Sequence, residues 1–300
     1  MKTKTYLFTR MAMALTLGSC SDNENGIGGE TSKYITVSTS IGNMTRVATD
    51  EKGGQTFEEG DEISVYAWTG DATVAPETRE RVVNNAINKL TNGSWVSTPQ
   101  MLWKNNRDKH YFIGVYPISA ISDLSAGEYT FDVNKQTESD LLVAVNKDGL
   151  SYNVDEQQPV PLTFTHVMAK LVVNLTYKNQ WGGIPTVEKV VVGNAAKEAT
   201  INYLTKVVTP STTAKEDFSL PEITENTKYV SVIIPQEEVT QLTIVIGGKN
   251  FVYDNGTPFK LESGKITTVN LEVGRDEIKL GDVKITNWED GSTFSGEALN

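Results

Sequence analysis

Cysteine, histidine and long apolar runs are scarce in this 300-residue chain. It contains one Cys and two His, too few for a disulfide framework or a Cys-rich zinc site. No apolar run approaches the roughly 18 residues that a membrane-spanning helix needs. Positive charge is also in the minority, because 27 Lys and Arg face 38 Asp and Glu, for a net charge of −11. Such a surface repels a phosphate backbone, so we expect no nucleic-acid partner.

What the chain does contain is enough apolar sequence for a folded body. Hydrophobic residues make up 38% and charged residues 22% of the chain, which excludes a disordered polymer. The length suits one large domain or two ordinary ones.

The lone cysteine lies at the end of a short N-terminal segment with the features of a targeting signal. Basic residues at positions 2, 4 and 10 precede an apolar run at 11–17, and Leu17-Gly18-Ser19-Cys20 follows. This order is typical of a secretory signal, and its end resembles the bacterial lipobox. The resemblance implies that residues 1–19 are a lipoprotein signal peptide and that the thiol of Cys20 is acylated, for example with palmitate. The alternative is a stray Cys in an apolar N-terminus. The polar residues 21–29 indicate a flexible tether and resemble the acidic tag that routes some lipoproteins to the outer cell surface.

The body of the chain reads as short strands separated by turns. Alternating, β-branched-rich segments lie at 34–40, 63–68, 111–116, 129–133, 141–145, 171–177, 189–192, 229–234, 242–246, 251–253, 267–273 and 283–286. Gly-containing pairs between them predict turns at 92–93, 148–149, 182–183, 247–248, 255–256 and 290–291. The pattern predicts an all-β protein built from antiparallel β-sandwiches.

One segment carries two conflicting signals. Val83, Ala86, Ile87 and Leu90 have the spacing of a helical face. The Asn92-Gly93 pair that follows favours a tight hairpin, and three Asn within the segment disfavour a helix interior. We predict a strand that runs into a hairpin.

A connector at 154–161, with acidic residues, two Gln and two Pro, suggests a domain boundary near residue 160. We therefore expect an N-terminal β-sandwich domain at 47–160 and a C-terminal one at 161–300, after a tether and propeptide at 20–46.

No catalytic pattern stands out. There is no Gly-x-Ser-x-Gly elbow, and adjacent carboxylates on a strand point to opposite faces. His166, between two apolar stretches, reads as a core or interface residue, and His110 as part of a solvated charged turn. The acidic loop 49–54 lacks the register of a calcium loop. We expect no enzyme activity, no cofactor and no metal.

Three tryptophans admit two interpretations. Trp68, Trp95 and Trp103 are expected to fill the core or its rim. The alternative is a flat aromatic platform that binds a sugar.

An ordered set of motifs resembles the fimbrillin family, the type V pilus subunits of anaerobic bacteria. Besides Cys20 and its acidic follow-on, the set comprises Thr45-Arg46, Phe57-x-x-Gly60-Asp61-x-Ile63-x-Val65-x-Ala67, the Trp95 and Trp103 region, Phe112-x-x-x-Tyr116-Pro117, Asp140-Leu141-Leu142, Phe164-Thr165-His166-x-x-Ala169-Lys170-Leu171 and Ile285-Thr286-x-Trp288-x-Asp290-Gly291. The resemblance implies two tandem transthyretin-like β-sandwiches and a lipoprotein that becomes a subunit of cell-surface fimbriae at the outer membrane. Its partners would be other fimbrial subunits. The alternative is a lipid-anchored adhesin, or a tip or anchor subunit, that binds a glycan or a host protein.

The resemblance also implies two processing and assembly sites. An Arg-specific protease would cut between Arg46 and Val47, in an exposed-looking stretch where proteases act; the alternative is an ordinary surface Arg. The strand at 34–41 would then leave its sheet and expose a groove with an unpaired edge, which is a template for another chain's strand. The expected donor is the segment 278–294, with Val283, Ile285 and Trp288 as its apolar residues.

Overall fold

The computed structural model describes residues 33–42, 56–153 and 158–288. All of them belong to one compact unit, which begins at Lys33. Cys20, Arg46, Val47, the acidic loop 49–54 and the predicted turn at 290–291 lie outside the described residues.

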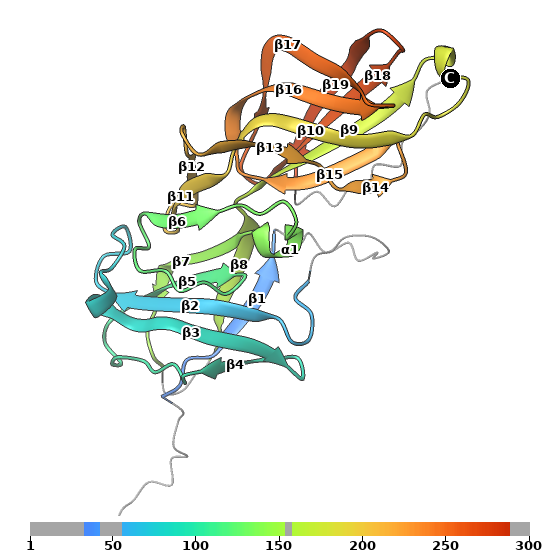
Figure 1. Cartoon of the computed structure of the whole chain (residues 1–300). Helices are drawn as coiled ribbons and strands as arrows, with labels where there is room; N and C mark the ends of the chain where they lie inside the picture. The colour runs from blue at the N-terminus through green and yellow to red at the C-terminus, as the bar shows by residue number, and fades with distance from the viewer. Residues whose placement is uncertain (1–32, 43–55, 154–157, 289–300) are drawn as a thin grey trace, which may run out of the picture. The chain divides into compact units, whose positions relative to one another are not determined.

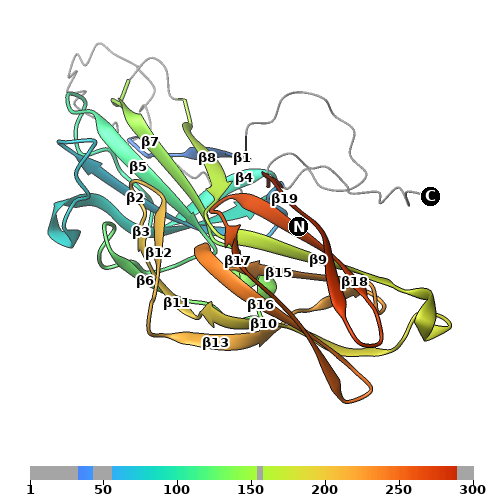
Figure 2. The ribbon, with the colours of Figure 1, turned by 90° about the horizontal axis from the view of Figure 1, so that it is seen from above.

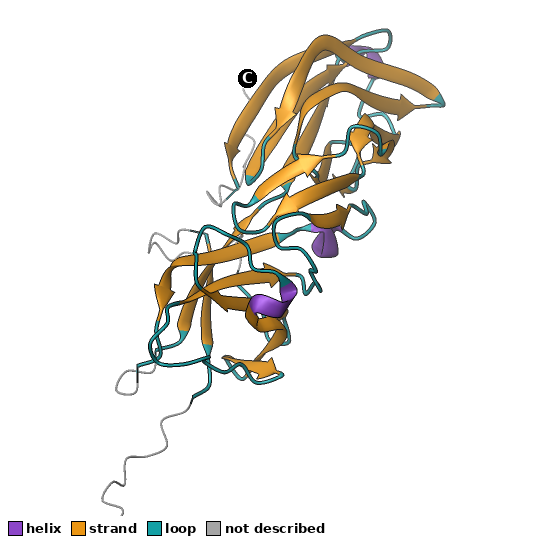
Figure 3. Ribbon diagram, turned by 90° about the vertical axis from the view of Figure 1, so that its left-hand side faces the viewer, coloured by secondary structure: helices purple, strands orange, loops and turns teal. Residues whose placement is uncertain are grey.

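Strands dominate the described chain, as the alternating sequence predicts (Figure 3). Its helical segments are the four-residue α1 (Gln136–Ser139) and two 3-10 turns, η1 (Thr78–Glu80) and η2 (Asn179–Trp181). The all-β fold class is therefore confirmed.

The first sheet has seven strands in the order β1-β8-β7-β5-β2-β3-β4 (Figure 1). Every neighbouring pair is antiparallel except β1 and β8, which run parallel. The strands are β1 (Val37–Ile41), β2 (Glu62–Thr69), β3 (Arg81–Thr91), β4 (Ser94–Thr98), β5 (His110–Tyr116), β7 (Leu142–Leu150) and β8 (Val160–His166).

The later part of the chain forms two further sheets, of five and four strands. Their orders are β14-β15-β9-β18-β19 and β13-β10-β16-β17 (Figure 2). These strands are β9 (Ala169–Tyr177), β10 (Val187–Ala196), β13 (Lys215–Ser219), β14 (Glu222–Thr224), β15 (Lys228–Ile233), β16 (Gln236–Ile246), β17 (Lys249–Leu261), β18 (Lys265–Val273) and β19 (Ile278–Asn287).

A small third group joins the two parts of the chain. β6 (Gly127–Thr130), which precedes β7, pairs with β11 (Glu198–Asn202), and β11 pairs with β12 (Val207–Pro210). The apolar core is continuous here as well, because one buried cluster contains both Tyr66 of β2 and Ile201 of β11. Sheet membership changes between His166 and Ala169, a few residues after the boundary expected at 160. The division into two sandwich domains at that residue stays a prediction.

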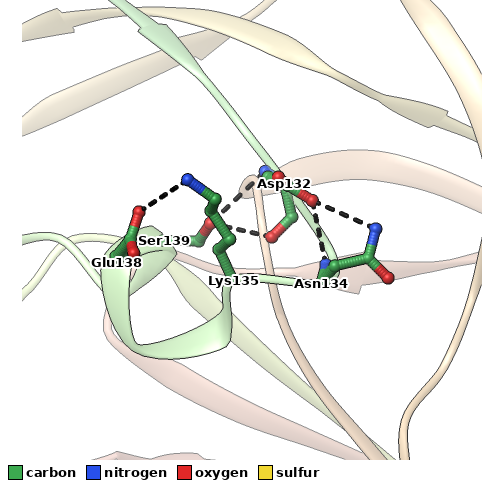
Figure 4. A network of polar contacts seen from close by, with 5 residues as sticks. All are labelled: Asp132, Asn134, Lys135, Glu138 and Ser139. Atoms are coloured by element: carbon green, nitrogen blue, oxygen red, sulfur yellow. Dashed lines mark hydrogen bonds and ion pairs between the residues drawn. The ribbon is translucent and has the colours of Figure 1, made fainter.

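The loop that carries α1 also reaches across to the second part. Figure 4 shows how its polar contacts fold it: Ser139 Oγ donates to the Asp132 carbonyl oxygen at 3.0 Å, and Lys135 pairs with Glu138 at 3.1 Å. From this loop, Gln136 Oε1 accepts a hydrogen bond of 2.7 Å from Val232 N in β15. The loop is thus held by its own polar contacts and by a hydrogen bond to β15.

The central strand β2 is buried on both faces. Ile63, Val65 and Ala67 face one cluster of buried side chains, while Tyr66 and Trp68 face the other. A strand covered on both sides needs apolar residues at successive positions. That requirement explains why β2 is continuously buried, although its sequence reads as alternating large and small residues.

The ambiguous segment 83–90 is a strand, as predicted. It lies within β3, and Asn92 and Gly93 adopt φ of 51° and 73° in the turn to β4. Two residues with positive φ match the turn that best fits the twist of a hairpin.

Two sequence predictions about turns are wrong. The pairs at 148–149 and 255–256 lie inside β7 and β17. Gly149, at φ 72°, lies where the β5–β7 register shifts, and residues 255–258 are extra residues where the β16–β17 register shifts. Gly at a bulge produces the same local signal as Gly at a turn.

Candidate functional site

β1 is an edge strand of the first sheet, and it and the residues just before it contact two other segments. On one side it pairs with β8, from Val37 opposite Val160 to Ile41 opposite Phe164. On the other side Ile35 N donates to the Met101 carbonyl oxygen at 2.8 Å. The chain therefore pairs with β8 along β1 and, just before β1, with the segment that holds Met101.

Buried and hydrogen-bonded side chains also hold β1 and the residues just before it in place. Ile35 and Val37 are buried at 2% and 6% exposure in the core beneath the sheet. The indole of Trp95 in β4 donates to Thr39 Oγ1 at 3.0 Å. If β1 were removed, the pocket for two apolar side chains and the backbone groups of two edges would be open.

β19 forms an edge of the five-stranded sheet. It pairs with β18 along its whole length, from Val273 opposite Ile278 to Lys265 opposite Asn287. No described strand pairs with its other edge. Val283 and Ile285 are 37% and 40% exposed. These two donor candidates thus lie on an edge strand with apolar side chains accessible to a partner.

The third donor candidate, Trp288, is placed differently. It follows β19 directly and is only 7% exposed. Its ring stacks on His166, with centroids 4.0 Å apart and planes 7° apart. His166 is buried, as the sequence predicts, and its Nδ1 lies 2.8 Å from Asp140 Oδ1. Lys170 Nζ lies 5.4 Å from the centre of the Trp288 ring. Trp288 is therefore packed inside its own subunit.

The electrostatics of this cluster follow from burial. Desolvation lowers the pKa of Lys170, and the nearby negative charge of Asp140 opposes that shift. The sequence motifs contained His166, Asp140 and Trp288 but gave no signal that they meet. Three separate segments come together only when the fold brings the start of β7, the end of β8 and the end of β19 to one place.

His110 corrects a sequence prediction. It begins β5 and is fully buried, whereas its charged neighbours predicted a solvated turn. Lys104 N donates to its Nε2 at 3.0 Å, and Nδ1 lies 3.0 Å from the Asp108 carbonyl oxygen. Burial lowers the pKa of His110. The charged residues form the turn, and His110 is the first residue of the strand that follows that turn.

The three tryptophans have structural roles. Trp68 is 2% exposed and donates Nε1 to the Asp71 carbonyl oxygen at 2.9 Å. Trp95 packs edge-on against Phe57 at 5.3 Å, and Trp103 packs edge-on against His110 at 5.0 Å. Each ring therefore contributes to packing at the rim or inside the first sheet.

Two further observations concern ions and membranes. Among the described residues, no group of three or more His, Cys, Asp or Glu side chains is placed to hold a metal ion. Within the same residues, no helix has both the length and the apolar character to cross a bilayer.

Solved structures of other proteins share this fold. The chain aligns over 86% of its length with all of a proposed cell adhesion protein from Bacteroides uniformis, at 19% identity and a TM-score of 0.64. A proposed cell adhesion protein from Bacteroides ovatus (18% identity, 85% of this chain and 98% of that one) gives a TM-score of 0.62. A fimbrial protein from Bacteroides vulgatus (12% identity, 84% and 99%) gives 0.52.

These identities are low, so the likenesses establish the fold alone. The comparison with curated proteins finds no match. The profile of the fimbrillin-like family matches residues 45–288, which is most of the chain. The chain therefore belongs to the fimbrillin-like family.

Proposed function

We propose that this protein is a structural subunit of cell-surface fimbriae that joins its neighbours by exchanging strands. Membership of the fimbrillin-like family supports the fimbrial role. The single observation that supports strand exchange is the place of β1 and of the residues just before it. β1 pairs with β8, Ile35 donates to the Met101 carbonyl oxygen, and Ile35 and Val37 are buried. Its loss would open a groove that only another strand can fill.

The route to that state would begin with export and processing. Cys20 would carry the lipid that holds the precursor at the outer membrane, and cleavage between Arg46 and Val47 would release β1. A Cys20→Ser variant should lose acyl labelling and membrane retention. Mature protein purified from cells should begin at Val47; assembled material that still begins at acylated Cys20 would contradict the cleavage step.

The donor would be the C-terminal segment 278–294, of which β19 is the described part. β19 is an edge strand, and its Val283 and Ile285 are spaced by two, like the Ile35 and Val37 that they would replace. Head-to-tail addition of this kind gives a filament unless the rotation closes a ring.

A truncation tests the donor role. A chain that ends at Gly281 lacks most of β19, so after export and cleavage it should not polymerise. The ladder of high-mass species on unheated denaturing gels reports polymerisation. Folding of the truncated subunit is checked by protection of the seven-stranded sheet from proteolysis. A correctly exported and cleaved truncation that polymerises as well as the full chain would exclude this donor.

A tip or anchor subunit that binds a glycan or host protein is the second candidate. It is favoured by a hollow of about 800 Å³ beside β2 and β3. Its lining includes Trp103, Arg79, Lys104 and two exposed apolar residues, Val74 and Leu102. Saturable binding on a glycan array that is lost in Trp103→Ala would support this role. Absence from isolated fimbrial shafts would separate it from the structural role.

Non-enzymatic function is a further part of the proposal. The family is one of fimbrial structural proteins, and the buried His166 is occupied by its contacts with Asp140 and Trp288.

A further inference from the structure

The C-terminal strand is held unevenly along its length. In the middle of β19, from Gly281 to Ile285, every residue is exposed. Ile278 and Leu280 are partly buried against the core. Trp288, at the other end, is buried and has a stacked aromatic partner. Detachment of the C-terminal end of β19 therefore requires the Trp288 ring to leave its place.

The place that holds this ring is built from well-fixed parts. His166 cannot turn freely, because its side chain is 2% exposed and its Nδ1 contacts Asp140 Oδ1 at 2.8 Å. The Trp288 ring covers the flat face of that imidazole, and Lys170 Nζ lies on the ring at cation–π distance. A planar side chain is thus bound by one aromatic face and one cation.

The backbone under this ring is fixed as well. Trp288 N donates to the Gly264 carbonyl oxygen at 3.0 Å, and Gly264 N donates to the Met168 carbonyl oxygen at 2.9 Å. Gly264 has φ of 67°, and a Cβ there would lie 3.0 Å from the His166 carbonyl oxygen. Only glycine suits so close an approach. The turn before β18 is therefore tied to the turn between β8 and β9, and Trp288 is tied to both.

From these contacts we infer that Trp288 is a latch that keeps β19 on its own subunit. While its ring is stacked on His166, β19 stays paired with β18 and is not available to another chain. When the ring leaves, the exposed middle of the strand offers little side-chain burial to hold it. The latch itself is a property of the single subunit, and its consequence for assembly rests on the strand exchange proposed above.

Hydrogen–deuterium exchange of the uncleaved, full-chain subunit tests the latch directly. In Trp288→Ala, amides of β19 should exchange at least about tenfold faster, because loss of a buried aromatic ring weakens the local structure. Trp288→Phe, which keeps an aromatic face, should give a smaller increase. The matched control is Lys279→Ala on the same strand, whose side chain is 60% exposed and whose loss should leave the exchange nearly unchanged.

Exchange in β2 and β5 shows whether each variant is folded. If Trp288→Ala loses protection there, Trp288→Phe takes its place with the same expected direction. Exchange of β19 that is unchanged in the folded variant, or raised equally by Lys279→Ala, would overturn the latch.

A second arm separates the latch from the assembly mechanism. Cleaved Trp288→Ala subunits should polymerise at least about tenfold faster than the parent, in line with the faster opening of β19. Faster exchange of β19 without faster polymerisation would leave the latch in place and contradict the donor role of β19. Unchanged exchange would exclude the latch whatever the polymerisation rate.

Discussion

Trp95 in β4 donates its indole N–H to Thr39 in β1, at 3.0 Å, and so joins the two edge strands of the seven-stranded sheet. β1 is consequently held from both sides although it has only five residues. A strand held in this way covers neighbouring backbone groups in the precursor. Its removal would leave the backbone groups of two segments unpaired at once.

The Trp95–Thr39 hydrogen bond should have a measurable effect on the precursor only. Thr39→Val keeps the shape of the side chain but removes the acceptor, and we expect a loss of about 1 kcal/mol in the free energy of unfolding. Urea denaturation of the uncleaved protein measures it. Thr36→Val, at an exposed position just before β1, is the matched control and should change the value by less than about 0.5 kcal/mol. Equal values for the two variants would contradict the role of this contact.

A glycine in β5 makes room for the strand next to β1. A Cβ at Gly114 would lie 2.7 Å from Phe164 Cζ in β8. Gly114→Ala should therefore destabilise the protein by roughly 1–3 kcal/mol, because both atoms belong to a packed core. Gly193→Ala is the control: its Cβ would lie 2.9 Å from Gln241 Oε1, at the far end of a flexible side chain, and 3.5 Å or more from the other Gln241 atoms. Thermal unfolding of both variants checks the prediction, and a loss in Gly193→Ala as large as in Gly114→Ala would refute it.

Buried His110 should make stability depend on pH. Its pKa is lowered in the folded state, so the unfolded chain binds the proton more readily. The stability it contributes is complete above the unfolded pKa, about 6.5, and is lost as pH falls towards the folded pKa. The slope from this one group is at most about 1.4 kcal/mol per pH unit.

His110→Gln keeps a side-chain acceptor for Lys104 N but does not titrate. We expect the variant to have a flatter dependence of unfolding free energy on pH between 7 and 5. Parallel curves for the two proteins, from urea titrations across this range, would contradict the assignment.

The sequence predicted the strands well because their signals are local. β2, β3 and the hairpin at Asn92-Gly93 follow from β-branched residues and turn chemistry within a few positions. The errors at 148–149 and 255–256 have one cause, since a bulge and a turn need the same residue types. The sequence pattern predicted His110 in a turn, whereas it begins a strand. The ends of strands are the positions that sequence patterns predict least well.

The candidate site was predicted only in part. The polar–apolar alternation of β19 predicts one covered face, yet Val283 and Ile285 are exposed like the polar residues between them. The contact between Trp288 and His166 joins residues 122 positions apart, and no local pattern contains it. The parallel pairing of β1 with β8 is equally non-local, because it depends on how the whole sheet curls.

Photo-cross-linking from β19 tests the proposed assembly most directly. A photo-reactive residue in place of Ile285 projects from an edge strand, and one in place of Val207, an exposed residue of β12, is the matched control. After cleavage at Arg46, strand exchange predicts that position 285 cross-links to β8 or to residues 101–103 of a neighbouring subunit, and that uncleaved protein gives no such product. Cross-links from position 285 that stay within one subunit, or that match those from position 207, would contradict the account.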